Sequence, residues 1–295
     1  MEREEMTTPV ATAQTSLTRV LVGFVRPAEI DTYLQSTIQI DARNIDLGKF
    51  AIAHAAAHAH ASSLKARPEA KVTPFVGDHP HLRALRAEPT FQEIESSGPI
   101  ELAWVDVRKL RVTQPRVDWR YVEQLVAEAP EVGDEAALLQ FCVPLQQTAP
   151  ADAATQSSFS RTTQALSFVT DNPDFRIGGP VVDNIGNGRA LLGFWISPGL
   201  RQMIGMDIGG RCALRNGYHR AVALAARGHT EVPILISRNS AEQTPARPGM
   251  FPPGLVFGDA PPRIEDFFGP AAVDLPRRRA RTLYSVQVAT YAIVD

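Results

Sequence analysis

The chain is poor in cysteine, in net charge and in long apolar runs. Its 295 residues contain only two cysteines, Cys142 and Cys212, each in hydrophobic surroundings and without a paired spacing. Such isolated thiols favour buried, reduced side chains over a disulfide framework or a zinc site. Because no apolar stretch reaches about 18 residues and the first residues are acidic, we expect no membrane span, no signal peptide and a cytoplasmic protein.

The formal net charge is only −2. This balance argues against a protein that coats nucleic acid through bulk charge, because that mode needs a strong basic surplus. A net charge near zero is still compatible with a local basic cleft. The chain is otherwise rich in apolar residues, with 44% hydrophobic and 21% charged. It can therefore bury a sizeable core, as one large domain or two small ones.

Composition and periodicity divide the chain into four parts. We expect a flexible polar tail over residues 1–15 and an N-terminal α/β extension over 16–99. An α/β core follows over 100–238, and a Pro-rich segment with a C-terminal strand occupies 239–295. Within the core, the polar stretch 146–160 indicates a surface loop or an insertion.

Individual elements are predicted inside these parts. The β-branched run 17–25 predicts a strand, and the alanine-rich run 49–65 predicts a helix that ends before Pro68. Residues 176–189 are rich in turn formers and indicate hairpin turns. Apolar residues alternate from Leu283 to Val294, which predicts a terminal strand.

The most informative motif is a strand, a glycine turn and a helix start over residues 210–228. Asn216-Gly217 predicts a tight turn, and the alanine- and leucine-rich run after it predicts a helix that ends at Gly228. A helix N-terminus leaves backbone N–H groups unpaired and carries a positive dipole end, which suits a phosphate or a carboxylate. The neighbouring cationic candidates are Arg215, His219 and Arg220.

A plain structural interpretation of this motif stands beside the functional one. In it, Asn216-Gly217 makes an ordinary turn, and His219 and Arg220 only cap or solvate the helix. A second segment favours the functional interpretation, because residues 105–125 place Gln114-Pro115-Arg116 between a predicted strand and a predicted helix.

Taken together, the two segments resemble the ParB and sulfiredoxin superfamily. Domains of that family open with a strand, a Gln-Pro-Arg turn and a short helix, and close with a Gly-x-x-Arg signature on a strand-turn-helix. The matching residues here are Gln114-Pro115-Arg116, Gly217-Tyr218-His219-Arg220, Gly228 and Val232-Pro233. The resemblance covers residues 100–238 and implies an α/β (α+β) fold, in which a mixed sheet is covered by helices and flanked by N-terminal and C-terminal extensions.

The chain also departs from that family at chemically important positions. Tyr218 stands where sulfiredoxins carry the nucleophilic cysteine, and Tyr121 stands where they carry a lysine. A phenol cannot replace a thiolate in sulfinate reduction, which proceeds through a sulfur–sulfur bond, so we exclude that activity. The Pro-rich chain after Ser237 shows no pair of periodic helices, which argues against the DNA-binding domain of chromosome-partition proteins.

The resemblance implies a nucleotide-binding protein that hydrolyses a nucleoside triphosphate, CTP or ATP with magnesium, or transfers its phosphate. Asp118 and Glu123 are then candidate magnesium ligands or bases, and His219 is a third candidate catalytic residue. Where some family members that phosphorylate small molecules carry an acid, this chain has Asn216. The implied nucleotide-binding residues are Gln114, Arg116, Arg215, Asn216, Gly217, Tyr218, His219 and Arg220.

Two alternatives stay open. The same site can bind a nucleotide only to set a conformation or a homodimeric state, without turnover. A DNA-binding or nuclease-type factor is the other alternative, and the acidic balance of the chain weighs against it.

Three histidines need a separate interpretation. His54 and His58 are spaced i,i+4 on one predicted helix face, with His60 beside them, and this spacing can hold a metal. No glutamate lies between them and no further ligand lies near them in sequence. We therefore favour a face whose histidines contact solvent or another element.

Overall fold

The computed structural model describes most of the chain. The described residues are 15–34, 45–77, 79–88, 91–92, 95, 98–145, 156–160, 162, 165–170, 175–186, 189–198, 201–238, 249–278 and 282–287. Residues 1–14 of the expected tail (1–15), residues 146–155 of the polar stretch (146–160) and residues 288–294 of the predicted terminal strand lie outside these residues.

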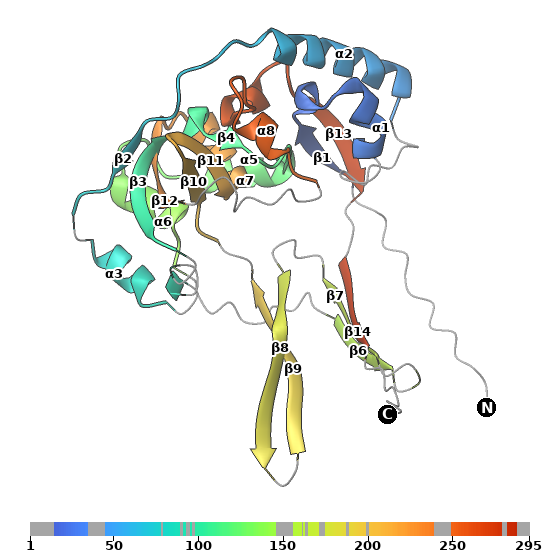
Figure 1. Ribbon diagram of the computed structural model, residues 1–295, viewed down its shortest axis with the longest axis vertical. Coiled ribbons are helices and arrows are strands. Elements are labelled where there is room, and N and C mark those ends of the chain that lie inside the picture. Colours follow the sequence, from blue (N-terminus) through green and yellow to red (C-terminus); the bar gives the residue numbers. More distant parts are fainter. Residues whose placement is uncertain are drawn as a thin grey trace.

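The largest described sheet is six-stranded and mixed, and it lies at the upper left in Figure 1. Two of its neighbouring pairs, β12 with β10 and β11 with β4, are parallel, and the other three are antiparallel. The expected mixture of helices with a mixed sheet is confirmed. In spatial order the strands are β2 (Val72–Pro74), β3 (Ile100–Asp106), β12 (Glu231–Ser237), β10 (Ile204–Ile208), β11 (Arg211–Asn216) and β4 (Arg111–Val112).

Three helices of the expected core surround this sheet, and two begin at a carboxylate. Asp118 precedes α5 (Trp119–Glu128) and Asp134 precedes α6 (Glu135–Cys142), each accepting a backbone N–H of the first turn. Such N-caps satisfy donors that a helix start leaves unpaired. The third helix, α7 (Tyr218–Arg227), is buried through Ala221–Ala225 because it packs against both α5 and the 3₁₀ turn η7 (Ile264–Phe268).

A second, three-stranded sheet joins the two ends of the chain to the core. In it, β1 (Thr15–Val20) lies between β13 (Val273–Arg278) and β5 (Arg116–Asp118), antiparallel to both. The predicted strand at 17–25 is thus present but ends at Val20. Because β2 also joins the main sheet, strand pairing crosses both expected boundaries, at residues 99/100 and 238/239.

The N-terminal extension wraps the three-stranded sheet with short elements and one long helix. The predicted alanine-rich helix is confirmed as α2 (Leu47–Ser63), which packs closely on the 3₁₀ turn η1 (Val22–Phe24). A Cβ at Gly23 would lie 2.5 Å from the carbonyl oxygen of Ala57, so only glycine permits this approach. The short elements of this extension are η2 (Pro27–Glu29), α1 (Ile30–Tyr33) and α3 (Pro80–Arg86). Two others lie outside it, η5 (Val107–Lys109) in the core and α8 (Pro253–Val256) in the C-terminal segment.

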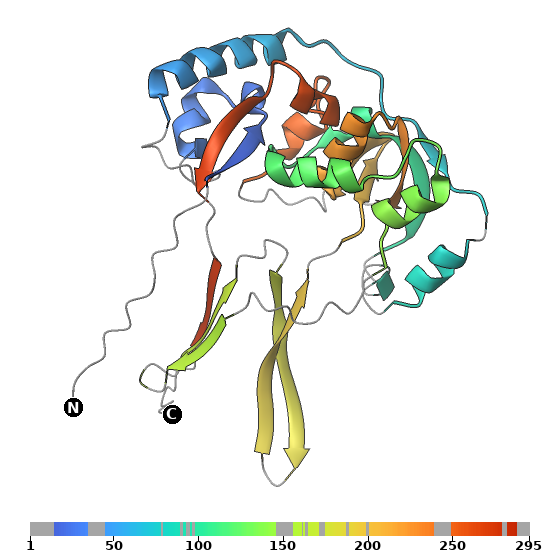
Figure 2. The same ribbon diagram turned by 180° about the vertical axis from the view of Figure 1, so that it is seen from behind.

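Two small β structures extend away from this body (Figures 1 and 2). One is the antiparallel hairpin of β8 (Phe175–Gly186) and β9 (Arg189–Pro198). The pairing of Gly186 with Arg189 agrees with the expected reversal at the end of 176–189, whereas residues 176–180, also expected to turn, lie within β8. The other is a three-stranded sheet that contains the start of the predicted terminal strand. Its order is β14 (Thr282–Gln287), β7 (Ala165–Thr170) and β6 (Gln156–Ser160).

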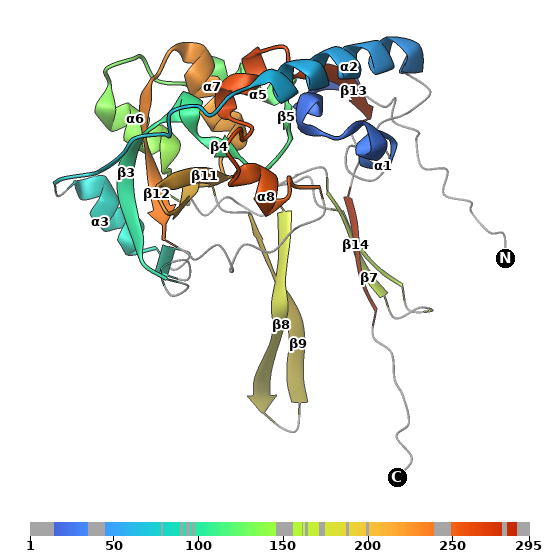
Figure 3. The same cartoon turned by 45° about the horizontal axis from the view of Figure 1, so that its top comes forward.

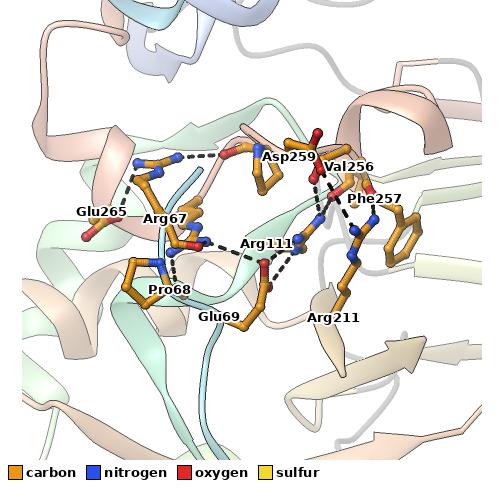
Figure 4. A network of polar contacts seen from close by, with 12 residues as sticks. Arg67, Pro68, Glu69, Arg111, Arg211, Val256, Phe257, Asp259 and Glu265 are labelled. Atoms are coloured by element: carbon orange, nitrogen blue, oxygen red, sulfur yellow. Dashed lines mark hydrogen bonds and ion pairs between the residues drawn. The ribbon is translucent and has the colours of Figure 1, made fainter. Parts of the chain in front are cut away.

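A buried network of arginines fixes the linker after α2 to the C-terminal segment (Figure 4). Arg67 donates to both carboxylate oxygens of Asp266, at 2.7 and 2.9 Å. Arg263, which is 1% exposed, donates to the carbonyl oxygens of Pro68 and Arg67 at 2.6 and 2.8 Å. Burial and the nearby charge of Arg67 lower the pKa of Arg263 from its usual value. Buried charges persist in proteins when they are paired and hydrogen-bonded, as the Arg67 guanidinium is by Asp266.

Candidate functional site

The two motifs predicted from the sequence meet at their helix starts. The strand-turn-helix over 210–228 is confirmed as β11, Gly217 and α7. In the second motif β4 precedes the segment Gln114-Pro115 and α5 follows it, but Arg116, expected in the turn, lies in the short strand β5 between that segment and α5. The helices α5 and α7 pack against each other, as Figures 2 and 3 show. The backbone N–H of Asp118 donates to Nε2 of His219 at 3.0 Å. This hydrogen bond places the start of α7 directly against the start of α5.

The same bond defines the chemistry of the His219 imidazole. Because Nε2 accepts a hydrogen bond from the backbone N–H of Asp118, its lone pair is engaged and the ring proton lies on Nδ1. His219 is therefore a neutral imidazole in this arrangement, with Nδ1–H as its donor. The expected cationic role of His219 requires the Asp118 bond to break.

Gly217 gives the turn its shape. It adopts the left-handed conformation at φ 93°, and a Cβ there would lie 2.6 Å from Cγ of Met203. A side chain would therefore be both strained and crowded. The turn leads directly into α7, whose first-turn N–H groups carry the positive end of the helix dipole. This is the local geometry that suits an anion.

Tyr218 is buried inside the protein. Its hydroxyl donates to the carbonyl oxygen of Leu214 and shares a hydrogen bond with the hydroxyl of Thr113. Burial raises the pKa of Tyr218 to about 12. The phenol thus joins α7 to β11 and to the end of β4, so only the backbone N–H of Tyr218 can serve the expected nucleotide site.

The segment before β10 occupies the other side of the turn. The side-chain amide of Asn216 donates to the carbonyl oxygen of Gln202 at 2.8 Å, and Arg220 donates to the carbonyl oxygen of Arg201. The Arg220 guanidinium also lies 5.9 Å from the ring centre of Phe141 in α6. Arg220 thus points toward α6, and Arg215 is exposed at the end of β11.

The Gln-Pro-Arg segment is held by a hydrogen bond between its own first and last residues. The side-chain amide of Gln114 donates to the carbonyl oxygen of Arg116 at 2.7 Å, and Arg116 lies opposite Val20 of β1. One carboxylate oxygen of Asp118 accepts the Tyr121 N–H at 3.2 Å. The segments before α5 (residues 113–117) and before α7 (residues 216–217) are called the paired turns below. Asp118 borders them, and its second carboxylate oxygen takes no part in the N-cap hydrogen bond of α5.

Glu123 does not join this arrangement. It is exposed on α5 and stands about 200° around the helix axis from Tyr121, given 3.6 residues per turn. Since Tyr121 contacts His219, Glu123 faces away from the paired turns. Of the two predicted carboxylates, Asp118 and Glu123, only Asp118 thus borders the paired turns.

Sequence reasoning missed three groups at this place. Tyr121 is 40% exposed, and its ring centre lies 5.2 Å from that of His219, with the ring planes at 61°. The hydroxyls of Thr18, opposite Asp118 in the sheet, and of Tyr33 are buried with no hydrogen-bond partner within the described part of the chain. Burial strongly raises the pKa of Tyr33, against the nearby positive charge of Arg116. No local pattern marks Thr18 or Tyr33. Thr18 comes opposite Asp118 only through the long-range pairing of β1 with β5, and Tyr33 comes near Arg116 from α1, in a distant part of the chain.

The histidines of α2 have structural partners. Nε2 of His54 lies 3.0 Å from the carbonyl oxygen of Val25, and Nδ1 of His58 lies 3.0 Å from that of Gly23. This confirms that the histidine face contacts another element. In the described ranges no group of three or more metal-binding side chains comes together.

Comparisons with known proteins add no identification. No protein-family model, no curated protein and no solved structure matches the chain. Among the helices that the structure describes, none combines the length and apolarity needed to cross a bilayer.

Proposed function

We propose that the protein binds a nucleoside triphosphate, CTP or ATP with magnesium, at the paired turns of α5 and α7, and hydrolyses it or transfers its phosphate. The observation that carries this proposal is the hydrogen bond from Asp118 N–H to His219 Nε2. It brings two helix N-termini together, and each contributes a positive dipole end to one place. The resemblance of both turns to the ParB and sulfiredoxin superfamily supports the same site.

Phosphoryl transfer requires the protein mainly to position the phosphates and to neutralise their charge. Phosphoryl transfer depends on positioned cations and usually magnesium, rather than on a protein nucleophile. The backbone N–H groups of Gly217 to Arg220 are proposed to hold the phosphates, with Nδ1–H of His219 as a further donor. Arg116 and Arg215 are proposed to neutralise charge, and the open oxygen of Asp118 to hold magnesium or accept a proton.

A non-catalytic switch is the second candidate function. It is favoured by the shortage of carboxylates, because Glu123 faces away and the amide of Asn216 is committed to Gln202. In that case the nucleotide binds and sets a conformation or an assembly state. Steady release of inorganic phosphate supports the enzyme, and stoichiometric binding without release supports the switch.

The test of the site compares three arginine variants by thermal shift and calorimetry with each nucleotide, with and without magnesium. A ligand that binds only the native state raises the unfolding temperature. Arg116→Ala and Arg215→Ala should each weaken binding by about 1.5–3 kcal/mol, the range for hydrogen bonds to charged groups. Because both would act on one ligand, their double variant should be non-additive.

Arg227→Ala is the matched control, since Arg227 lies at the opposite end of α7 in an exposed pair with Glu131. Its nucleotide affinity should stay within about twofold, because exposed ion pairs contribute little. Equal nucleotide affinity in all three single variants, with the fold intact, would exclude the paired turns as the site.

A further inference from the structure

Tyr121 combines exposure with a fixed position beside the paired turns. It lies in the first turn of α5 and is 40% exposed. Asp118 holds both sides of this contact, since its carboxylate accepts the Tyr121 N–H at 3.2 Å and its own N–H donates to His219 at 3.0 Å. The Tyr121 and His219 rings then meet edge to face at 5.2 Å. One residue thus holds the Tyr121 backbone and the His219 ring next to each other.

The neighbouring aromatic residues have contacts that lie away from the turn of α7. Trp119, two residues earlier, has the Arg19 guanidinium 3.4 Å from its ring centre. Phe268 is exposed, but its ring packs edge-on against Trp119. Of the aromatic rings at the start of α5, Tyr121 is therefore the one in contact with the turn of α7.

Backbone N–H groups and arginines recognise phosphate, and such contacts cannot distinguish a nucleotide from a bare polyphosphate. Selection of a nucleotide needs a contact to the base. Aromatic side chains provide one, because every base has a π face that stacks on them. Stacking of this kind tolerates all bases.

We propose that Tyr121 is the platform on which the nucleobase stacks while the phosphates lie at the start of α7. This inference rests on the proposed nucleotide site. It makes Tyr121 the residue that selects nucleotides over inorganic polyphosphates, without selecting among bases.

The experiment measures the affinity of the full-length protein for a nucleoside triphosphate and for tripolyphosphate. Tyr121→Ala and Tyr121→Leu should each lose about 5- to 150-fold in affinity for the nucleotide, the range for one stacked base. Tyr121→Phe keeps the ring and should stay within about twofold. All variants should bind tripolyphosphate as the wild type does, and the wild type should prefer the nucleotide. Circular dichroism verifies the fold of each variant.

The outcomes separate the two proposals. If the wild type binds neither ligand, the proposed function fails and the inference fails with it. If the wild type binds the nucleotide but Tyr121→Ala and Tyr121→Leu bind it equally well, only the inference is overturned. An equal loss of nucleotide and tripolyphosphate also overturns it, because Tyr121 would then act by supporting His219.

Discussion

The guanidinium of Arg111 donates to both carboxylate oxygens of Glu69, at 2.9 Å from Nε and 2.5 Å from Nη2 (Figure 4). Arg111 is 1% exposed, and its remaining nitrogen donates to the carbonyl oxygens of Val256 and Gly258 at 2.7 and 2.9 Å. One side chain of β4 thereby holds the linker after α2 and the C-terminal segment together. Glu69 is the counter-charge that makes this burial tolerable.

Glu69→Gln should destabilise the protein at neutral pH. The variant removes the negative charge and leaves Arg111 buried without its ionic partner, which typically costs about 3 kcal/mol or more when a buried pair is broken. Because the carboxylate itself is partly exposed, solvent screening reduces this figure. Urea unfolding at pH 7 measures it. Glu101→Gln is the control, since Glu101 pairs with Arg238 at the surface, and it should have little effect.

The same pair predicts how stability depends on pH. The hydrogen bond from Arg111 lowers the pKa of Glu69 below its usual value. A carboxyl group whose folded pKa is depressed stabilises the protein above its unfolded pKa of about 4.3, and this contribution is lost as the pH falls through the folded pKa. Wild-type stability should therefore fall in acid more steeply than that of Glu69→Gln, and the two curves should converge. Parallel curves from pH 7 to pH 3 would contradict this role.

Arg111 also shows why much of the fold escapes sequence reasoning. It stands in the charged run Arg108-Lys109-Leu110-Arg111, which suggests a solvated surface, yet it is buried. Its partners are 42 and 145 residues away in the chain. Burial of a charge depends on such partners, and no local pattern reveals them.

Elements with local signals were predicted well. The alanine content of α2, the Asn-Gly turn before α7 and the glycine after it are all features of neighbouring residues. The pairing of β1 with β13 has no such local signal, because paired residues such as Arg19 and Asp274 are 255 positions apart. The same limit explains the candidate site: the sequence indicated both turns, whereas the contact of Tyr121 with His219 emerges only from the packing of α5 on α7.

Both cysteines should be unreactive in the native protein. Burial raises the pKa of the Cys142 thiol far above its usual range, and it raises the pKa of Cys212 to about 12, with a smaller effect from the charge of Asp207. The thiolate is the reactive form, so neither should react with a thiol reagent at pH 8, whereas the urea-unfolded chain should titrate both. Rapid labelling of the folded protein would contradict the burial of these thiols and reopen a catalytic role for them.

Gly217→Ala should destabilise the protein more than Gly228→Ala. Both glycines flank α7 in the left-handed conformation, at φ 93° and 98°, so alanine costs about 1–2 kcal/mol at each. Only at Gly217 does the added Cβ also meet another residue, at 2.6 Å from Cγ and 3.0 Å from Cα of Met203. Overpacking of this kind costs about 1–3 kcal/mol more. Equilibrium urea unfolding gives both values.

The comparison isolates the crowding because the backbone strain is common to both positions and the surroundings of Gly228 are open, with nothing within 4 Å of an added Cβ. Met203→Ala should cost about 2–5 kcal/mol by itself, since Met203 is fully buried. Combined with Gly217→Ala, it should cost less than the sum of the two single variants, because truncating Met203 removes the clash. Additive costs, or equal costs at Gly217 and Gly228, would show that the 201–203 segment moves aside freely. The rigid turn on which the proposed anion site depends would then lack its support.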